Sequence, residues 1–82
     1  MPVAHLRLFA SAREAAGTSR DTVAGATVGE VLSVATERFG PQFETVLRSC
    51  KVWVNGEAAD HTTCVGDDDE VAVLPPVSGG EQ

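Results

Sequence analysis

The chain has 82 residues, a mass of 8.5 kDa and a formal net charge of −6. This length allows one domain with a small core and excludes a two-domain enzyme with a deep cleft between its domains. Acidic residues are concentrated late in the chain, because residues 52–82 contain seven of them and no lysine or arginine. Such a distribution disfavours nucleic acid and an anionic membrane surface as partners, and it favours a protein with a basic groove.

The composition is that of a folded domain, with 43% hydrophobic and 22% charged residues. No apolar run in the sequence approaches the roughly 18 residues that a membrane-spanning helix requires. The first residues have neither the basic nor the apolar region of a signal peptide, so we expect a cytoplasmic protein. In that compartment the two cysteines, Cys50 and Cys64, are expected to be free, buried thiols.

The first part of the chain predicts two strands with a short helix between them. Residues 3–10 alternate apolar and polar side chains and predict a strand, and residues 18–24 predict a weaker one. Between these segments, Ser11 and Glu14 have the spacing of a capping box. They predict a short helix that ends at Gly17.

The longest predicted helix begins at a second capping box, formed by Thr27 and Glu30. Its apolar residues recur at helical spacing and make one stripe: Val28, Val31, Leu32, Ala35 and Phe39. Gly40 is expected to stop this helix in the left-handed conformation, and Pro41 prevents its continuation. Residues 42–47 are expected to add one or two further helical turns.

The second half of the chain predicts three strands. Residues 51–54 and 57–64 flank the dipeptide Asn55-Gly56, which favours a two-residue hairpin because both of its positions require a positive φ. Residues 70–74 are expected to form the last strand, with side chains that alternate between two faces. One helical stripe covered by one sheet gives a two-layer α+β domain.

The end of the chain differs from the rest in composition. Residues 75–82 contain one apolar side chain, Val77, and cannot offset the entropy cost of ordering themselves, so we expect a flexible tail after a domain of residues 1–74. Two consecutive prolines stiffen its base, and Gly79 and Gly80 leave backbone without side-chain bulk near its end. A glycine pair is by itself also typical of plain flexible chain. A stiff arm with a thin end, however, can present a carboxyl group inside another protein's active site.

Residues 67–80, with the ending Pro-Pro-Val-Ser-Gly-Gly, resemble the C-terminal signature of the MoaD/ThiS sulfur carriers. They are most similar to MoaD, the small subunit of molybdopterin synthase. The opening of the chain also matches this family, in Leu8-Phe9-Ala10, Arg13-Glu14 and Gly17-Thr18, as does Val54-Asn55 at the hairpin. The resemblance spans residues 3–80. It implies the ubiquitin-like β-grasp fold, an α+β domain in which a mixed sheet packs on one main helix.

The resemblance also implies a chemistry, in which the terminal glycine carboxylate, here that of Gly80, is the reactive group. An ATP-using enzyme of the ubiquitin-activating type adenylates this carboxylate, and a sulfur donor displaces AMP to leave a thiocarboxylate. The carrier then inserts its tail into a MoaE-like large synthase subunit. There it donates sulfur for the dithiolene that holds molybdenum in the cofactor. The chain itself is expected to bind no cofactor and to have no active site of its own.

The same resemblance assigns roles to the remaining tail residues and to one surface. Gly79 provides clearance in the partner's channel, and four residues before it hold the arm extended there: Pro75, Pro76, Val77 and Ser78. In this family the sheet face near the first and last strands meets the partner. This implies an exposed apolar docking patch made of Phe9, Val73, Leu74 and Pro75. For Phe9 the residue pattern leaves a position in the core equally open.

The chain departs from the family in continuing beyond Gly80 with Glu81 and Gln82. The amide bond at Gly80 cannot be adenylated as a carboxylate can. Three explanations stay open: a protease, such as the metalloprotease that matures some related carriers, removes the two residues; they are not part of the natural chain; or this paralogue has lost the carrier function. Alternatives to the molybdenum pathway are a carrier for cysteine or thiamin biosynthesis, and a β-grasp binding module without thiocarboxylate chemistry.

Two further motifs give weaker indications. The acidic residues 67–70 lack the spacing of a calcium loop and are more typical of a solvated turn that helps to steer a basic partner. His61 and Cys64 lack the four closely spaced ligands of a structural zinc site, so no metal is expected. Trp53 is expected in the core or in an interface.

Overall fold

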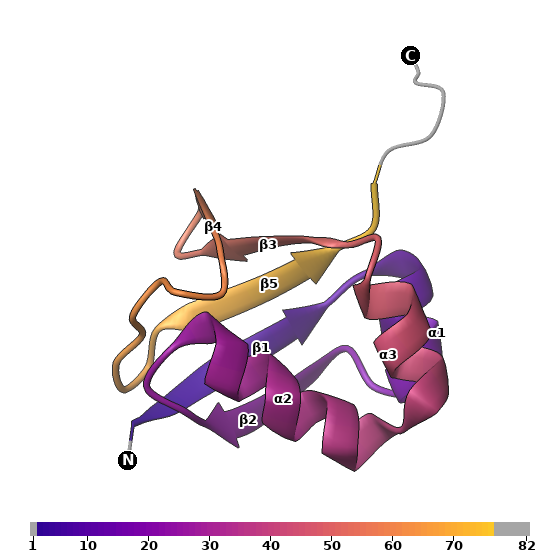
Figure 1. Ribbon diagram of the computed structural model, residues 1–82, viewed down its shortest axis with the longest axis horizontal. Coiled ribbons are helices and arrows are strands. Elements are labelled where there is room, and N and C mark those ends of the chain that lie inside the picture. Colours follow the sequence, from indigo (N-terminus) through magenta and orange to yellow (C-terminus); the bar gives the residue numbers. More distant parts are fainter. Residues whose placement is uncertain (1, 77–82) are drawn as a thin grey trace.

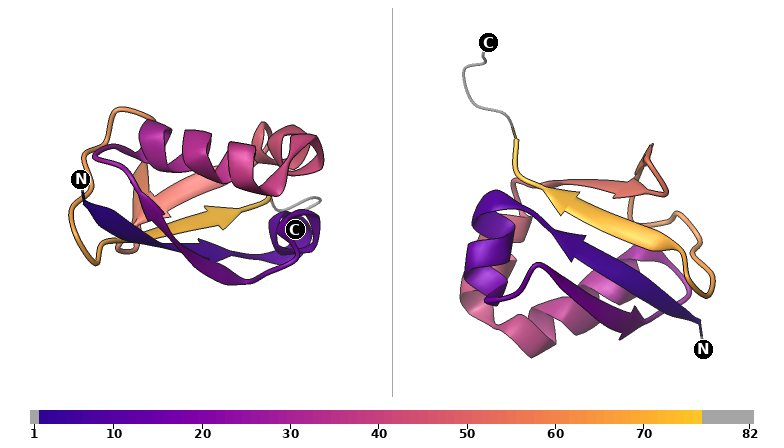
Figure 2. Two further views of the ribbon diagram at one scale, coloured as in Figure 1. Left: turned by 90° about the horizontal axis from the view of Figure 1, so that it is seen from below. Right: turned by 180° about the vertical axis from the view of Figure 1, so that it is seen from behind.

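The computed structural model describes residues 2–76 and contains one five-stranded sheet and three helices (Figure 1). The helices α2 and α3 cover one face of the sheet, and α1 lies at the end of the sheet beside α3 (Figure 2). The elements in chain order are β1 (Val3–Leu8), α1 (Ala10–Ala16), β2 (Arg20–Ala24), α2 (Val28–Phe39), α3 (Pro41–Leu47), β3 (Lys51–Val54), β4 (Glu57–Ala59) and β5 (Glu70–Leu74). Within residues 2–76, no helix is long and apolar enough to span a membrane.

The sheet is mixed and has the strand order β2-β1-β5-β3-β4. The first and last strands, β1 and β5, lie side by side and run parallel, and the other neighbouring pairs are antiparallel. Val73 of β5 stands opposite Leu8 of β1 on one side and opposite Val52 of β3 on the other. The last strand is therefore the centre of the sheet, and the chain leaves the domain from that centre.

The core lies between the sheet and the apolar stripe of α2. Four of the five predicted stripe residues are buried: Val28, Val31, Leu32 and Ala35. Phe39 is half-buried and packs edge-on against Phe43 of α3, with 5.2 Å between the ring centroids. The sheet contributes the alternate residues Ala4, Leu6, Leu8, Val71 and Val73. Each valine or leucine buried here contributes about 1.5–3 kcal/mol to folding, which makes this layer the main source of stability.

The helix α2 begins as its capping box predicts. The Thr27 hydroxyl accepts a hydrogen bond from the Glu30 N–H at 3.2 Å, and the Glu30 carboxylate accepts from the Ala26 N–H at 2.7 Å. Two further N–H groups at this end of the helix bond to the segment after β4. The Val28 N–H donates to the Thr63 carbonyl, and the Gly29 N–H donates to the carbonyl of residue 61. The helix start is thus fixed by local and distant residues together.

The capping box predicted for α1 is wrong. This helix begins at Ala10, one residue before Ser11, and its N-cap is Phe9, whose side chain makes no capping hydrogen bond. The Phe9 N–H donates to the Val73 carbonyl at 3.3 Å, which ties the chain to β5 and makes the helix start directly after β1. At the other end the prediction is confirmed, since Gly17 takes the left-handed conformation at φ 79°.

Two further expectations need correction, for Gly40 and for the start of β2. Gly40 has φ 97° and ψ −175° instead of left-handed helical angles, because it ends α2 and also precedes Pro41, the first residue of α3. Residues 57–64 carry the expected return strand and its exit: the strand ends at Ala59, because the Asp60 carboxylate accepts hydrogen bonds from the N–H and hydroxyl of Thr62 and closes a turn. The weaker strand predicted over residues 18–24 begins at Arg20.

Both cysteines are free, but the expected burial is wrong for Cys64. Cys64 is exposed, since it lies in the segment between β4 and β5 and forms only an isolated bridge with Thr27 at the surface. Cys50 is half-buried, and its thiol donates to the Val46 carbonyl at 3.3 Å. Burial raises the pKa of the Cys50 thiol, which makes it a poor nucleophile at neutral pH.

Candidate functional site

The face of the sheet opposite α2 and α3 carries no helix of the described chain (Figure 2). Alternation along the strands sends every second side chain to this outer face. At the end where β1 and β5 finish, the outer side chains are apolar. We call the group of Phe9, Trp53, Ala72 and Leu74 the outer sheet patch.

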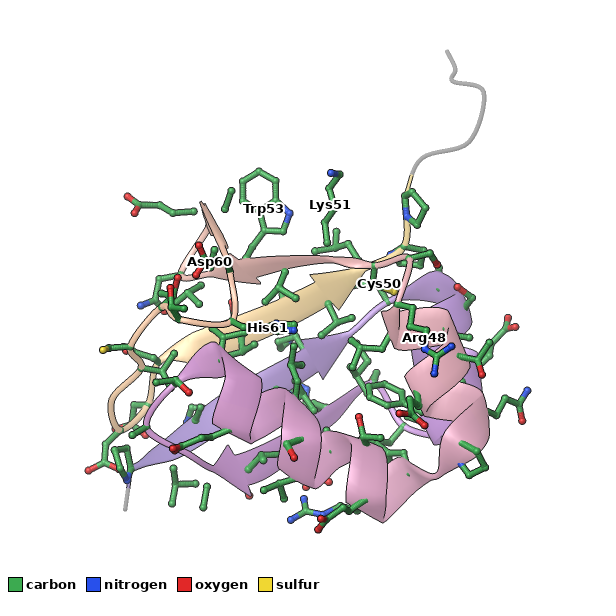
Figure 3. The ribbon with its side chains drawn as sticks, viewed as in Figure 1. Arg48, Cys50, Lys51, Trp53, Asp60 and His61 are labelled. Atoms are coloured by element: carbon green, nitrogen blue, oxygen red, sulfur yellow. The ribbon has the colours of Figure 1, made fainter. Side chains whose placement is uncertain are left out.

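The outer sheet patch lines a shallow depression of about 300 Å³, together with Gly56 and Glu70. Trp53 stands directly opposite Ala72 in the register of β3 and β5. Phe9 is 38% exposed and Trp53 is 36% exposed, values that are high for large apolar side chains. In Figure 3, Trp53 and Lys51 project from the same side of β3. The patch therefore offers apolar surface and a hollow that an apolar side chain of a partner can fill.

Positive charge borders the outer sheet patch. The Arg7 guanidinium lies 5.6 Å from the centroid of the Phe9 ring and 2.9 Å from the Glu70 carboxylate, so it fixes the ring by a cation–π contact. Lys51 is exposed and stands opposite Leu74 in the sheet. Because Glu70 lines the depression and pairs with Arg7, Lys51 is the basic residue at this border whose charge has no ion-pair partner within residues 2–76. It can pair with an acidic group of a partner that covers the apolar side chains.

The acidic residues predicted as a turn do form one, at the opposite end of β5 from the patch. Asp67 accepts from the Val3 N–H at 2.8 Å, and Asp68 lies 3.1 Å from the His5 imidazole. The N–H of Gly66 and then the side-chain amide of Asn55 hold the pKa of Asp69 below its ordinary value. These carboxylates brace the start of β1 and the hairpin, and they lie apart from the exit of the tail.

Two of the residues predicted for docking, Phe9 and Leu74, lie in the outer sheet patch. The sequence left open whether Phe9 lies in the core or at the surface, and its exposure shows that it lies at the surface. The exposure expected of Val73 is wrong, because this side chain points to the helices and is 0% exposed. Ala72 takes its place on the outer face and was missed, although the alternation of residues 70–74 contains the signal. Trp53 is at the surface, where an interface residue is expected.

The tail leaves the domain beside the outer sheet patch. Leu74 ends β5, and Pro75 and Pro76 continue the chain, the first half-buried and the second exposed. The Phe9 N–H bonds to the Val73 carbonyl, and Figure 1 shows the end of β5 close to the start of α1. Because Phe9 and Leu74 both belong to the patch, the patch reaches the base of the tail. The predicted tail residues Val77, Ser78, Gly79 and Gly80, and the extension Glu81-Gln82, lie outside the described residues.

A second hollow, of about 410 Å³, lies on the helical side of β3. Leu32, Leu47 and Val52 line it with Arg48, Cys50 and His61, and Figure 3 shows the last three on the side of β3 away from Trp53. Glu44 also lines this hollow, but it does not come together with Cys50 and His61 as a metal-binding group. Across residues 2–76, no group of three or more His, Cys, Asp or Glu side chains is placed to hold a metal ion.

Comparison with known proteins identifies the family of the chain. Residues 6–80 match the ThiS family model, and this span includes most of the described domain and the glycine pair. This chain belongs to the ThiS family. It is therefore a ubiquitin-like protein of the sulfur-carrier type, as the resemblance of its C-terminal signature implies.

Solved structures agree with this assignment. The chain is 32% identical to small archaeal modifier protein 1 (SAMP1) from Methanosarcina acetivorans, with a TM-score of 0.88 and 98% of each chain covered. It is also 32% identical to SAMP1 from Haloferax volcanii, with a TM-score of 0.84, 95% of this chain and 99% of that chain. In the complex of subunits 1 and 2 of the molybdopterin-converting factor from Helicobacter pylori 26695, one chain is 22% identical, with a TM-score of 0.73, 95% of this chain and 99% of that chain. These likenesses confirm the expected β-grasp fold. Since proteins named as a modifier and as a converting factor share it, the fold does not select the pathway.

Proposed function

We propose that this ThiS-family protein is the small, sulfur-donating subunit of a molybdopterin synthase. Its reactive group would be the carboxylate of Gly80, liberated by removal of Glu81 and Gln82. One observation carries the proposal: the central strand β5 ends beside the outer sheet patch. The proposed docking surface therefore lies next to the point where the proposed reactive tail begins. The Pro-Pro-Val-Ser-Gly-Gly ending supports the choice of pathway.

The chemistry proposed for Gly80 proceeds in two steps on an activating enzyme. A carboxylate oxygen of Gly80 attacks the α-phosphate of ATP and releases pyrophosphate, which forms an acyl-adenylate. A sulfide-level donor then attacks the acyl carbon and displaces AMP, and the product is a thiocarboxylate. The carrier supplies the acyl group, while the enzyme binds ATP and supplies the acid and base groups. With Glu81 still attached, Gly80 has no free carboxylate oxygen for the first step.

The proposed division of labour fits the dimensions of the chain. The six residues 75–80 span at most about 20 Å when fully extended. Gly80 can therefore enter a partner's active site while the folded domain docks outside through the outer sheet patch. Both proposed partners, the activating enzyme and the MoaE-like large subunit, would have to bind the same end of the domain and thus compete for it.

Mass spectrometry tests the requirement for trimming. The chain 1–80 and the full chain 1–82 are each incubated with an activating enzyme, ATP and sulfide. We expect the shorter form to gain about 16 Da as one oxygen is replaced by sulfur, while the longer form keeps its mass. A gain of the same mass at the same rate in the full chain would contradict the proposal.

A matched pair of variants tests docking in the same assay. Phe9→Ala in the chain 1–80 should slow thiocarboxylate formation about tenfold, because a hot-spot side chain contributes more than about 1 kcal/mol to binding. Val3→Ala is the control, since Val3 is also exposed, at 43%, but lies at the start of β1. Equal rates for the two variants would show that the outer sheet patch is not the docking surface.

Genetics separates the molybdenum pathway from the alternatives. Deletion of the gene should abolish molybdoenzyme activity without making the cell require cysteine or thiamin. A cysteine or thiamin requirement would instead assign the carrier to one of those pathways. A β-grasp module that only binds would retain its partner in a pull-down after truncation at Ser78.

A second candidate function follows from the 32% identity to SAMP1, a protein named as a modifier. Here the amine of a target lysine would displace AMP from the Gly80 adenylate and form an amide. An affinity-tagged chain 1–80 produced in cells would then appear in bands of higher mass that survive boiling and reduction. The chain 1–79 is the control and should form no such bands. Their absence from both samples would exclude the modifier function.

A further inference from the structure

The strand β2 lies at one edge of the sheet, where backbone groups normally face solvent. Every second residue of an antiparallel edge strand turns its N–H and C=O away from the neighbouring strand. In β2, Arg20, Thr22 and Ala24 are these residues, because the carbonyl of Ser19 faces β1 and accepts from the Leu8 N–H at 2.9 Å. An open row of such groups is a template for pairing with another strand.

Side chains of the same chain bind the outward groups of two of these residues, Arg20 and Thr22. The Arg38 guanidinium, on α2, donates to the Thr22 carbonyl at 3.0 Å, and the Asp21 carboxylate accepts from the Thr22 N–H at 2.8 Å. The Thr18 hydroxyl donates to the Arg20 carbonyl at 3.0 Å and accepts from the Arg20 N–H at 3.4 Å. The outward groups of Arg20 and Thr22 are thus already paired within the molecule.

An ion pair holds this arrangement in place. The Nη1 atom of Arg38 that donates to Thr22 also donates to Asp21 Oδ2 at 2.7 Å. Arg38 comes from the last turn of α2, so the pair joins the helix to the edge of the sheet. A strand that paired with β2 would have to displace Arg38 and Asp21 from the backbone and separate their charges.

We propose that Thr18, Asp21 and Arg38 close the β2 edge to strand addition at Arg20 and Thr22 and thereby keep two copies of this chain from joining through it. A second copy is the natural occupant, because two β2 strands related by a twofold axis pair antiparallel with identical edges. In a pairing centred on Thr22, Asp21 stands opposite Val23 and Arg20 opposite Ala24, so no like charges oppose it. The other edge, β4, has only three residues and is protected by its shortness.

Closure of the edge also affects how partners meet the domain. With the outward groups of Arg20 and Thr22 already paired, an extended segment of another protein finds no continuous row of free backbone groups along β2, and the outer sheet patch remains the accessible surface for docking. The pairing of groups along β2 is independent of any chemistry at Gly80.

Sedimentation velocity on the full chain tests the proposal. Arg38→Ala removes the donor to Thr22 and leaves Asp21 without its partner. We expect this variant to form a dimer between micromolar and millimolar concentration, with association at least about tenfold tighter than wild type, equivalent to about 1.4 kcal/mol. Arg48→Ala is the matched control, because it removes the same charge from an arginine that makes no ion pair within residues 2–76. Wild type and the control should stay monomeric.

Hydrogen exchange at single amides shows whether the dimer uses β2. In Arg38→Ala, protection of the Thr22 amide should increase with protein concentration. Thr18→Val provides a second variant that uncaps Arg20 without touching α2, and the double variant should associate more tightly than either single one. The proposal is overturned if the double variant stays monomeric, if Arg48→Ala associates equally, or if Thr22 exchange is independent of concentration in the dimer.

Discussion

Val73 and Leu74 are neighbours in β5 but lie on opposite faces of the sheet. Val73 is 0% exposed and packs in the core between β1 and β3, whereas Leu74 is half-buried and lines the outer sheet patch. Substitution of each residue by alanine should therefore separate stability from docking. Val73→Ala should weaken the fold, and Leu74→Ala should weaken partner binding.

The size of the effect on stability follows from burial. Val73→Ala removes two methyl groups from the core, at about 0.8 kcal/mol each, and the cavity left behind raises the total loss to about 2 kcal/mol. For a domain of this size, such a loss lowers the melting temperature by about 8–16 °C. Leu74→Ala removes a partly exposed side chain and leaves no enclosed cavity, so its cost should stay below about 1 kcal/mol.

Thermal and urea denaturation followed by far-UV circular dichroism measure the stability of both variants, with the fluorescence of Trp53 as a second probe. Calorimetric titration with the large subunit, at a temperature where both variants are folded, measures docking. We expect Leu74→Ala to bind about tenfold more weakly than wild type and Val73→Ala to bind normally. Equal melting temperatures for the two variants, or weakened binding by Val73→Ala alone, would refute the assignment of these residues to opposite faces.

Five further substitutions, at four positions, test local features. The Arg38 side chain holds the pKa of Asp21 below its ordinary 3.8, so Asp21 stabilises the fold above that pH and the stabilisation is lost as the pH falls through the lowered pKa. Asp21→Asn should therefore show a smaller loss of unfolding free energy than wild type between about pH 5 and pH 2. Asn55→Gly tolerates the positive φ of 51° but loses two side-chain hydrogen bonds, to Asp69 and to the Glu70 N–H. Asn55→Ala loses the same hydrogen bonds and is also strained at this φ. Urea denaturation should therefore show wild type as the most stable form and Asn55→Ala as the least stable. Gly17→Ala should lower the free energy of unfolding by about 1 kcal/mol through the positive φ of 79° alone, because a Cβ at this position meets nothing within 4 Å. Ala10→Gly should instead raise the melting temperature, because glycine adopts the φ of 50° without strain. Shifts of the melting temperature in the same direction for both variants would contradict this reasoning.

The sequence alone determined those elements whose signals are local. The stripe on α2, the capping pair Thr27 and Glu30, and the hairpin at Asn55-Gly56 were all predictable, because each depends on residues within one or two turns of chain. The glycine pair of the tail is also a property of the sequence, since its proposed use needs a thin end and no folded surroundings.

Other features were decided only by the tertiary structure. Alternation showed that Val73 and Leu74 face opposite ways, but which of them is buried depends on the side to which α2 packs. The outer sheet patch joins Phe9, Trp53 and Ala72 through the parallel pairing of β1 with β5 and the antiparallel pairing of β5 with β3. The closed edge likewise joins Arg38 to Asp21 across 16 intervening residues. Strand order and helix placement follow from burying one common core, and no window of sequence contains that global balance.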